Sequence, residues 1–389
     1  MIEGVKFSGI HCGIKKNGKK DLALVLFDTP AMAVGVFTKN RVKAPSVLIT
    51  KKRIKENEIK ALIVVSGNAC VCVKGDKEDA IHITKKLANF LDIKEKSIAH
   101  ATTGVIGVKL PIEKVLQAIP ELVANLKKDV KDFASAITTT DAFEKIEKHE
   151  FKISNKTIKI LGIAKGAGMI APDLATMLVF IFTDGVIEKK AMDTALKEVV
   201  DETFNSISVD GDTSTNDMVL LFSTRTAGNK EITLKNGFKE FRNALKQVCL
   251  GLAKKIVMDG EGATKLIEIN IKGAKTVKDA KRVAKTVSNS QLVKTAFFGE
   301  DPNWGRIMAA IGRSGVNIKQ EKVDIKIQGF SVVKNGVNAK GCDEAKLKKA
   351  LKPKEIRVEI NLNLGKAETI FYTSDLTIEY VKINSAYRT

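Results

Sequence analysis

The feature that most constrains the fold is a run of six apolar residues, Met177 to Phe182, in the stretch TMLVFIFTD (176–184). Alternating apolar and polar residues would predict a strand with one solvent-exposed face, whereas a continuous apolar run predicts a strand covered on both faces. The run is far shorter than the roughly 18 residues that a membrane-spanning helix needs. We therefore expect a buried strand inside a large core.

Other segments extend this pattern along the chain. Further apolar strands are predicted at 22–28, 61–67, 157–164 and 217–224. Apolar residues at helical spacing predict amphipathic helices at 77–91, 191–207 and 238–257. In the C-terminal third, short alternating strands are expected at 324–329, 356–365 and 377–383, with shorter helices between them. The sequence therefore predicts a mixed α/β protein with a large core.

The charge of the chain raises the question of a nucleic-acid partner. Lysine and arginine number 65 against 45 acidic residues, a formal net charge of +20. The lysines are spread along the whole chain among Glu and Asp, and only 5% of residues are aromatic, so bases would find few stacking platforms. A solvated lysine-rich surface is favoured and no nucleic-acid partner is expected, although a basic nucleic-acid-binding protein stays as an alternative.

Cysteine usage and the N-terminus bear on the compartment. The five cysteines are an odd number and form no pair of CxxC motifs, which argues against a disulfide framework or a structural zinc site. The first ten residues, MIEGVKFSGI, include an early acid and no apolar stretch typical of a secretion signal. We expect a cytoplasmic protein with no membrane partner and no bound metal.

Two glycine-rich motifs suggest phosphate or dinucleotide binding, but neither fits in full. GIKKNGKK (13–20) has the spacing of a P-loop, yet Lys20 stands where a hydroxyl should reach magnesium. GAGMIA (166–171) follows a strand as a dinucleotide fingerprint does, but the next strand begins near Thr176 and leaves no room for a crossover helix. The four histidines show no metal-ligand spacing, so an acyl-transfer nucleophile would need a base other than histidine.

A threonine at the start of the buried strand offers such a nucleophile. Thr176 follows the small residue Ala175 and a glycine-rich loop, and it precedes the apolar run. A threonine hydroxyl becomes reactive when its own α-amine acts as the base, which requires the bond before it to be broken. Self-cleavage between Ala175 and Thr176 would create that N-terminus. The alternative is that Thr176 only begins a strand, as β-branched residues often do.

A series of motifs resembles those of one enzyme family. KGAGMIAPDLATML (165–178) is similar to the cleavage and nucleophile motif of the ornithine acetyltransferase family, also called the glutamate N-acetyltransferase or ArgJ family. The other matches occur in family order: GVFTKNRVKAP (35–45), ATTGVIG (101–107), TTTDAF (138–143), SVDGDTSTND (208–217), MDGEGATK (258–265), FFGEDPNWGRIMAAIGRSG (297–315) and YTSDLTIEYVKINSAYRT (372–389). The resemblance spans nearly the whole chain.

The resemblance implies a fold and an activity. The expected fold is a packed-sheet αββα sandwich with a smaller α/β region from about residue 276. Self-cleavage would give an α chain of residues 1–175 and a β chain of residues 176–389, assembled as two of each. The acetyl group would move from N2-acetyl-L-ornithine to L-glutamate by way of Thr176. No cofactor is expected, although some members use acetyl-CoA as a donor substrate.

The resemblance also implies roles for single residues. The Thr103 hydroxyl and the Gly104 N–H match an oxyanion hole, which stabilises the negative charge formed during acyl transfer. Lys165 matches a group that binds the substrate α-carboxylate, and Glu261 matches one that binds an amine. The remaining matches to substrate-binding positions are Thr139 or Thr140, Asn384 and Thr389.

Alternatives to these roles stay open on the sequence. Gly104 could be an ordinary loop glycine, and Lys165 and Glu261 could be surface charges. A related self-cleaving amidopeptidase, which passes the acyl group to water, is the second enzyme that the motifs allow; the Lys165 and Glu261 matches favour the transferase. The sequence departs from the family at Cys70, where asparagine is common, and we expect both Cys70 and Cys72 to be buried.

Overall fold

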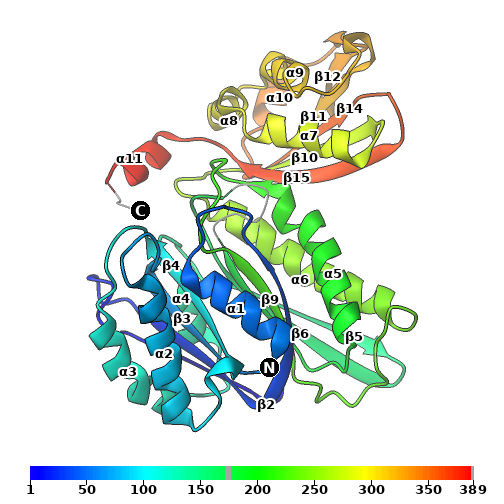
Figure 1. Ribbon diagram of the computed structural model, residues 1–389. Helices are drawn as coiled ribbons and strands as arrows, with labels where there is room; N and C mark the ends of the chain where they lie inside the picture. Colours follow the sequence, from blue (N-terminus) through cyan, green and yellow to red (C-terminus); the bar gives the residue numbers. More distant parts are fainter. Residues whose placement is uncertain (171–176, 387–389) are drawn as a thin grey trace.

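The computed structural model describes residues 1–170 and 177–386, which form two sheets and their covering helices (Figure 1). Within these residues the first sheet has eight strands in the order β4-β3-β2-β9-β7-β6-β5, and β1 pairs with β2. Its strands are β1 (Val5–Ile10), β2 (Leu22–Phe37), β3 (Ile59–Asn68), β4 (Ile98–Val105), β5 (Lys145–Ile153), β6 (Lys156–Lys165), β7 (Leu178–Thr183) and β9 (Met218–Ser223).

The long strand β2 divides this sheet into two halves. Its first part, Leu22 to Leu26, pairs with β3 and also with β1. Its last part, Met32 to Phe37, pairs with β9 in the other half. The pairing register with β3 shifts between Leu26 and Ala31, and such irregularities bend a strand. The bend allows the two halves to face each other.

A buried cluster between the two halves shows that they pack face to face. Leu178, Phe180 and Phe182 alternate along β7 and belong to a cluster with Phe7 and Leu62 of the other half. The ring centroids of Phe7 and Phe182 are 5.3 Å apart in an edge-to-face arrangement, a favoured geometry for aromatic pairs. Each such side chain removed from water stabilises the fold by about 1.5–3 kcal/mol. This cluster is the central core of the molecule.

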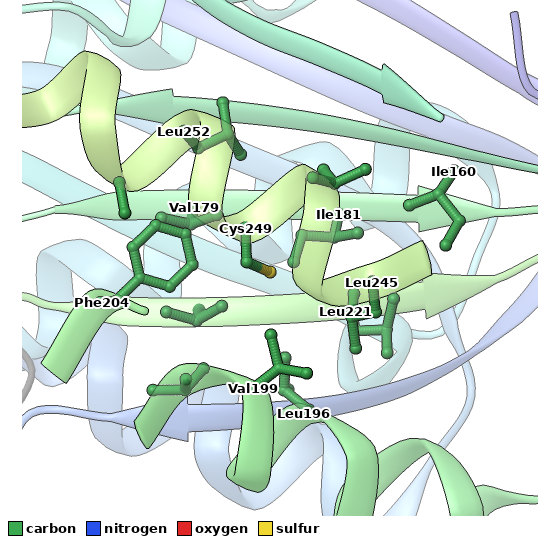
Figure 2. Close-up of a cluster of buried hydrophobic side chains, with 14 of the residues drawn as sticks. Ile160, Val179, Ile181, Leu196, Val199, Phe204, Leu221, Leu245, Cys249 and Leu252 are labelled. Atoms are coloured by element: carbon green, nitrogen blue, oxygen red, sulfur yellow. The ribbon is translucent and has the colours of Figure 1, made fainter. Parts of the chain in front are cut away.

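The intervening residues of the same strand point to the opposite face. Val179 and Ile181 pack beneath α5 (Lys189–Glu202) and α6 (Phe238–Met258), in the cluster of Figure 2. These two helices supply Leu196, Val199, Leu245 and Leu252, all fully buried. Because β7 is covered on both faces, a polar residue in it needs a partner, which explains the unbroken apolar run from Leu178 to Phe182.

The outer face of the other half is covered in the same way. Leu87 of α2 (Asp76–Leu91) and Ile119 of α3 (Ile112–Ala124) belong to one buried cluster with Ile63 of β3. Figure 1 shows α2 and α3 on one side of the two sheet halves, with α5 and α6 on the other. Two further helices, α1 (Pro45–Glu56) and α4 (Lys131–Ile137), add side chains to the central core. The layers are therefore helix, sheet, sheet and helix, as the resemblance implied.

The second sheet forms the C-terminal region, at the top of Figure 1. Its order in the described residues is β13-β12-β11-β14-β10-β15-β8. The strands are β8 (Ile207–Ser208), β10 (Leu266–Ala274), β11 (Asp324–Ile327), β12 (Phe330–Lys334), β13 (Val337–Asn338), β14 (Glu355–Asn361) and β15 (Ala367–Ser374). Its apolar core is completed by α7 (Val277–Ser288), α8 (Gln291–Phe298), α9 (Trp304–Gly312) and α10 (Glu344–Ala350).

The strand β8 connects the two sheets. It pairs with β15 through Ile207 opposite Tyr372, and the chain then runs through residues 209–217 into β9 of the first sheet. This loop therefore lies where the two sheets meet.

Most of the predicted elements are confirmed, although the strand predicted at 22–28 continues to Phe37 as β2 and the helix predicted at 191–207 ends at Glu202. The predicted strand at 377–383 is wrong, because this segment is the helix α11 (Ile378–Ala386). Strand β15 ends at Ser374, and Thr377 Oγ1 accepts a hydrogen bond from the Tyr380 N–H at 3.2 Å, which is the pattern of a helix N-cap. An alternating pattern forms a strand only where a neighbouring strand offers its backbone. Among the described helices, none is both long and apolar enough to cross a bilayer.

Candidate active site

A cavity of about 170 Å³ lies at the junction of the two sheets. Its walls come from the ends of β4 and β6, the loops at 138–144 and 209–217, the turn at 259–262 and helix α11. The described residues that line it are Ala69, Thr103, Gly104, Ile106, Thr139, Thr140, Lys165, Gly168, Met169, Asp210, Asp212, Ser214, Thr215, Asn216, Glu261, Tyr380 and Asn384.

The end of β4 brings Thr103 and Gly104 to the cavity. Gly104 has a φ of +133°, which side chains rarely allow, and it packs directly on β3. A Cβ at this position would lie 2.3 Å from the carbonyl carbon of Gly67, so only glycine fits. The neighbouring Thr103 is buried and lines the cavity beside it. A hydroxyl and a main-chain N–H at one strand end are suitable donors for a developing oxyanion.

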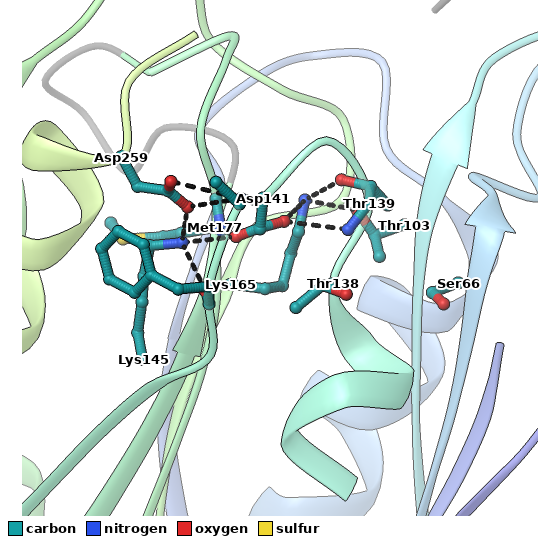
Figure 3. Close-up of polar contacts among 12 residues, drawn as sticks. Ser66, Thr103, Thr138, Thr139, Asp141, Lys145, Lys165, Met177 and Asp259 are labelled. Atoms are coloured by element: carbon teal, nitrogen blue, oxygen red, sulfur yellow. Dashed lines mark hydrogen bonds and ion pairs between the residues drawn. The ribbon is translucent and has the colours of Figure 1, made fainter. Parts of the chain in front are cut away.

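Lys165, the last residue of β6, places an ammonium group at the cavity wall. Its side chain is 3% exposed. Nζ donates a hydrogen bond to Thr139 Oγ1 at 2.7 Å and lies 3.4 Å from Thr103 Oγ1 (Figure 3). Lys165 is also paired across the sheet with Leu178, the first residue of β7. A cation and two hydroxyls therefore meet close to the start of the buried strand.

The three consecutive threonines have different surroundings. Thr138 Oγ1 donates to the Ser135 carbonyl at 2.7 Å, at the end of α4. Thr139 bonds Lys165, and Thr140 lines the same cavity. Thr139 and Thr140 are thus the members of the run that reach the cavity.

A buried carboxylate, Asp141, holds this region together. Its Oδ2 accepts a hydrogen bond from the Thr139 N–H at 2.8 Å, and Oδ1 accepts one from the Gly166 N–H at 2.6 Å. Oδ1 also pairs with Lys145 Nζ at 2.7 Å, and Lys145 pairs in turn with Asp259 (Figure 3). Asp141 therefore joins the threonine loop to the end of β6, where Lys165 lies.

The charges of this network shift its ionisation equilibria. Burial alone would raise the pKa of Asp141, but Lys165 and Lys145, together with the hydrogen bonds, bring the pKa well below its usual range. The pKa of Lys165 is lowered, first because burial disfavours the ammonium and second because Lys145 repels it, while Asp141 opposes the shift. Asp141 is consequently ionised near neutral pH, and Lys165 and Lys145 share its negative charge, while Asp259 is a second anion beside Lys145.

Glu261 lies on another wall of the cavity with Asn384. Glu261 Oε2 accepts a hydrogen bond from Asn384 Nδ2 at 2.9 Å, which ties α11 to the turn at 259–262. A Cβ added at Gly168 would lie 2.5 Å from the Glu261 carboxylate, so the glycine makes room for this side chain. The cavity therefore presents a cation from Lys165 and an acid from Glu261. An amino acid carries the two complementary charges.

The structure brings seven of the predicted site residues to one cavity and leaves three outside its description. The seven are Thr103, Gly104, Thr139, Thr140, Lys165, Glu261 and Asn384. The three that lie outside the described residues are Ala175, Thr176 and Thr389.

Sequence reasoning missed the carboxylates Asp141, Asp210 and Asp217. All three lie inside the quoted motifs TTTDAF and SVDGDTSTND, which was the available signal. The expectation for Cys72 was wrong, because its side chain is exposed, whereas Cys70 is buried as expected. Cys70 has a φ of +50°, a conformation that asparagine tolerates better than most residues, and this explains why asparagine suits that position.

The described residues offer no metal site. Within 1–170 and 177–386, no group of three or more His, Cys, Asp or Glu side chains could hold an ion.

Comparisons with known proteins show the family of this chain. The model of the ArgJ family matches residues 6–389. Two relatives named "Arginine biosynthesis bifunctional protein ArgJ" cover the whole chain: that of Geobacter sulfurreducens is 44% identical over its full length, and that of Caldanaerobacter subterraneus is 45% identical over 98% of its length. A crystal structure of the Bacillus halodurans ArgJ protein is 41% identical, with a TM-score of 0.52 over 54% of this chain and 98% of its own. The chain therefore belongs to the ArgJ family.

Proposed function

We propose that this chain is a self-processing acetyltransferase of arginine biosynthesis that moves an acetyl group from N2-acetyl-L-ornithine to L-glutamate. The single observation that carries the proposal is the position of Lys165. Its ammonium meets Thr103 and Thr139 in the cavity, while its backbone pairs with Leu178, two residues after the proposed nucleophile Thr176. Membership of the ArgJ family and the names of the relatives support the pathway.

The proposed reaction has two acyl-transfer stages on Thr176. The hydroxyl first attacks the Ala175 carbonyl, and water releases the upstream chain, which leaves Thr176 with a free α-amine. This amine then serves as the base when the hydroxyl attacks the acetyl carbonyl of acetylornithine: the amide C–N bond breaks, ornithine leaves with the proton, and the acetyl ester remains on Thr176. The amine of glutamate then attacks this ester, which forms acetylglutamate and restores the threonine hydroxyl. Thr103 and the Gly104 N–H stabilise the oxyanion, and Lys165 binds the carboxylate that donor and acceptor share.

The surroundings of the cavity support binding of a whole amino acid. Glu261 holds Asn384 and provides the acid for an amine, and Thr139, Thr140 and Thr389 complete the proposed substrate contacts. The length of the Bacillus halodurans chain supports processing. Nearly all of that chain matches slightly more than half of this one, and residues 176–389 are about the same share of this chain.

We further propose that the two fragments assemble as two α and two β chains. The compartment proposed is the cytoplasm, which the five free cysteines support. No cofactor is proposed, and acetyl-CoA is an alternative donor substrate.

Mass spectrometry of the purified protein tests the processing step. We expect fragments of residues 1–175 and 176–389, and a single intact chain for Thr176→Ala. The control is Thr183→Ala at the far end of β7, which should cleave normally. Cleavage at this bond in Thr176→Ala would exclude Thr176 as the nucleophile.

Activity assays test the reaction itself. Acetylornithine with glutamate should yield acetylglutamate and ornithine, and acetyl-CoA with glutamate shows whether the second donor is used. Release of free acetate from acetylornithine at the same rate without glutamate would instead indicate an amidohydrolase.

A further inference from the structure

The loop at 209–217 contacts the backbone on both sides of residues 171–176. It runs from β8 to β9, and its sequence VDGDTSTND contains three aspartates. Asp217 is buried and Asp210 is partly buried; Asp210 accepts hydrogen bonds from two main-chain N–H groups outside the loop, and Asp217 accepts one. The roles proposed above for the cavity residues use neither of them.

Asp210 binds the chain just before residue 171. Its Oδ2 accepts from the Met169 N–H at 2.6 Å, and its Oδ1 accepts from the Ile170 N–H at 2.8 Å. Met169 has a φ of +56°, an unfavourable conformation for a side chain of its size. The Ile170 carbonyl is bound as well, because it accepts from the Val209 N–H at 2.8 Å. These hydrogen bonds therefore hold the backbone at 169–170 in a conformation that Met169 would otherwise disfavour.

Asp217 binds the chain just after residue 176. Its Oδ1 accepts from the Met177 N–H at 2.9 Å, and the next residues begin the parallel pair of β7 and β9, with Leu178 opposite Met218. The side chain is buried, and within the described residues Oδ2 has no hydrogen-bond partner. A buried carboxyl oxygen without a partner costs free energy. If residue 217 only had to accept the Met177 N–H at the start of the strand, a smaller acceptor would do so at a lower cost.

We propose that Asp210 and Asp217 are positioning residues for self-cleavage, fixing the backbone immediately before and after the segment that contains the Ala175–Thr176 bond. This inference rests on the proposed function. Intramolecular attack requires the reacting groups to be held in place, and a displacement of about 1 Å can cost about 10²-fold in rate. Because Asp210 and Asp217 belong to one loop, they hold the backbone on the two sides of the segment in fixed positions relative to each other.

The chemistry of the two carboxylates gives different expectations for their variants. Asp210 uses both oxygens as acceptors, so the amide of Asp210→Asn would turn a donor toward one of the two N–H groups. Asp217 uses only Oδ1 toward Met177, so Asp217→Asn keeps the contact through its amide oxygen. Asp210→Asn, Asp210→Ala and Asp217→Ala should therefore slow cleavage by about 10²-fold, whereas Asp217→Asn should stay within about threefold of wild type.

A matched control exists at the opposite end of β7. Asp184 is also buried, and its Oδ1 accepts from the Lys159 N–H at 2.8 Å. Asp184→Asn removes a buried carboxylate bound to a main-chain N–H without touching either anchor. It should cleave at the wild-type rate.

The pH dependence of cleavage shows whether Asp210 acts as an ionised hydrogen-bond acceptor or only by packing. Burial raises the pKa of Asp210 to about 6, although its backbone hydrogen bonds oppose the shift. The charged or titratable groups that face it are Asp212 on its own loop, Lys294 of α8 and Tyr380 of α11. A protonated carboxyl accepts well at only one oxygen, so the wild-type cleavage rate should fall as the pH drops through about 6. Asp210→Asn should lack this inflection.

The experiment follows the disappearance of freshly purified intact chain by mass spectrometry between pH 5 and pH 8. Each aspartate substitution is also made together with Thr176→Ala, so that the stability of uncleaved chains can be compared by urea unfolding. Slow cleavage by variants whose uncleaved forms stay folded supports the proposal. Wild-type rates in Asp210→Ala and Asp217→Ala, or an unchanged inflection in Asp210→Asn, would overturn the proposal while leaving the proposed function intact. Failure of the wild type to cleave would overturn both.

Discussion

The carboxylate of Asp141 holds the backbone of Gly166, with Oδ1 2.6 Å from the amide nitrogen. Gly166 follows Lys165 directly and has a φ of +149°, so this contact sets the direction in which the chain leaves β6. The same carboxylate binds the Thr139 N–H and pairs with Lys145. One side chain thus positions both partners of the Lys165–Thr139 hydrogen bond.

Replacing Asp141 with asparagine should destabilise the protein strongly. The variant leaves Lys145 and Lys165 buried with one anion fewer, and breaking a buried pair in this way costs about 3–5 kcal/mol. Urea unfolding measures the change. Asp193→Asn breaks the exposed pair with Lys197 and is the matched control, with an expected loss below about 1 kcal/mol. Equal losses in the two variants would contradict a structural role for Asp141.

Removing the Thr103 hydroxyl should impair turnover far more than folding. Thr103→Ala deletes a single oxygen beside Gly104, and loss of one oxyanion donor lowers turnover by roughly 10²–10³. Steady-state rates with acetylornithine and glutamate measure the effect. Thr286→Ala on α7, whose hydroxyl bonds the Arg282 carbonyl, should leave turnover unchanged. If Thr103→Ala keeps the wild-type turnover, Thr103 is not part of the site.

Covalent transfer through Thr176 predicts ping-pong kinetics. Acetylornithine has a cationic tail and glutamate an anionic one, and a site that buried either tail would leave a charge unpaired with the other substrate. The shared amino-acid head should therefore bind at Lys165 for both substrates in turn. Initial rates over a grid of both substrates should give parallel double-reciprocal lines. Acetylornithine alone should add one acetyl mass to the fragment 176–389. Intersecting lines together with the absence of the acetylated fragment would indicate direct transfer.

His100 should make the protein sensitive to acid. It is fully buried in β4, and within the described residues neither ring nitrogen has a hydrogen-bond partner. Burial first, and Arg53 second, lower its pKa from 6.5 to about 3. Between these values the unfolded chain binds a proton that the folded chain does not, so stability is lost as the pH falls below 6.5. The loss is up to about 1.4 kcal/mol per pH unit within this window.

Urea unfolding at pH 7 and pH 5 measures this dependence. His100→Phe removes the titrating ring and should flatten the dependence relative to wild type. His82→Gln, which changes an exposed histidine on α2, should keep the wild-type slope. An identical slope in His100→Phe would mean that other groups cause the acid sensitivity.

The sequence by itself determined which segments form strands and helices and how many of their faces are buried; the order of the layers was implied by the family resemblance. The unbroken apolar run of β7 required cover on both faces, and the structure supplies it with Phe180 on one face and Ile181 on the other. The helical spacing of apolar residues likewise predicted α2, α5 and α6, since each needs to bury only one stripe. These features are local, because a strand or helix reveals in its own residues how many of its faces are buried.

The motifs identified which residues to examine, but not how they are held. Thr103, Lys165 and Glu261 were predicted from family resemblance, and their shared cavity required three distant segments of the chain to meet. Sequence alone could not show that Asp141 lies between Lys145 and Lys165, because an aspartate in a loop is usually solvated.

Only the tertiary structure decided the conformation of 377–383 and the partners of the buried charges. The alternating pattern of that segment suits a strand, but among the described residues no strand pairs with it, and Thr377 caps a helix instead. Asp210 and Asp217 are indistinguishable from surface aspartates in the sequence, and their N–H partners lie about 40 residues away. The physical reason is the same in each case: burial of a polar group is acceptable only with a partner, and the partner is chosen by the packing of the whole chain.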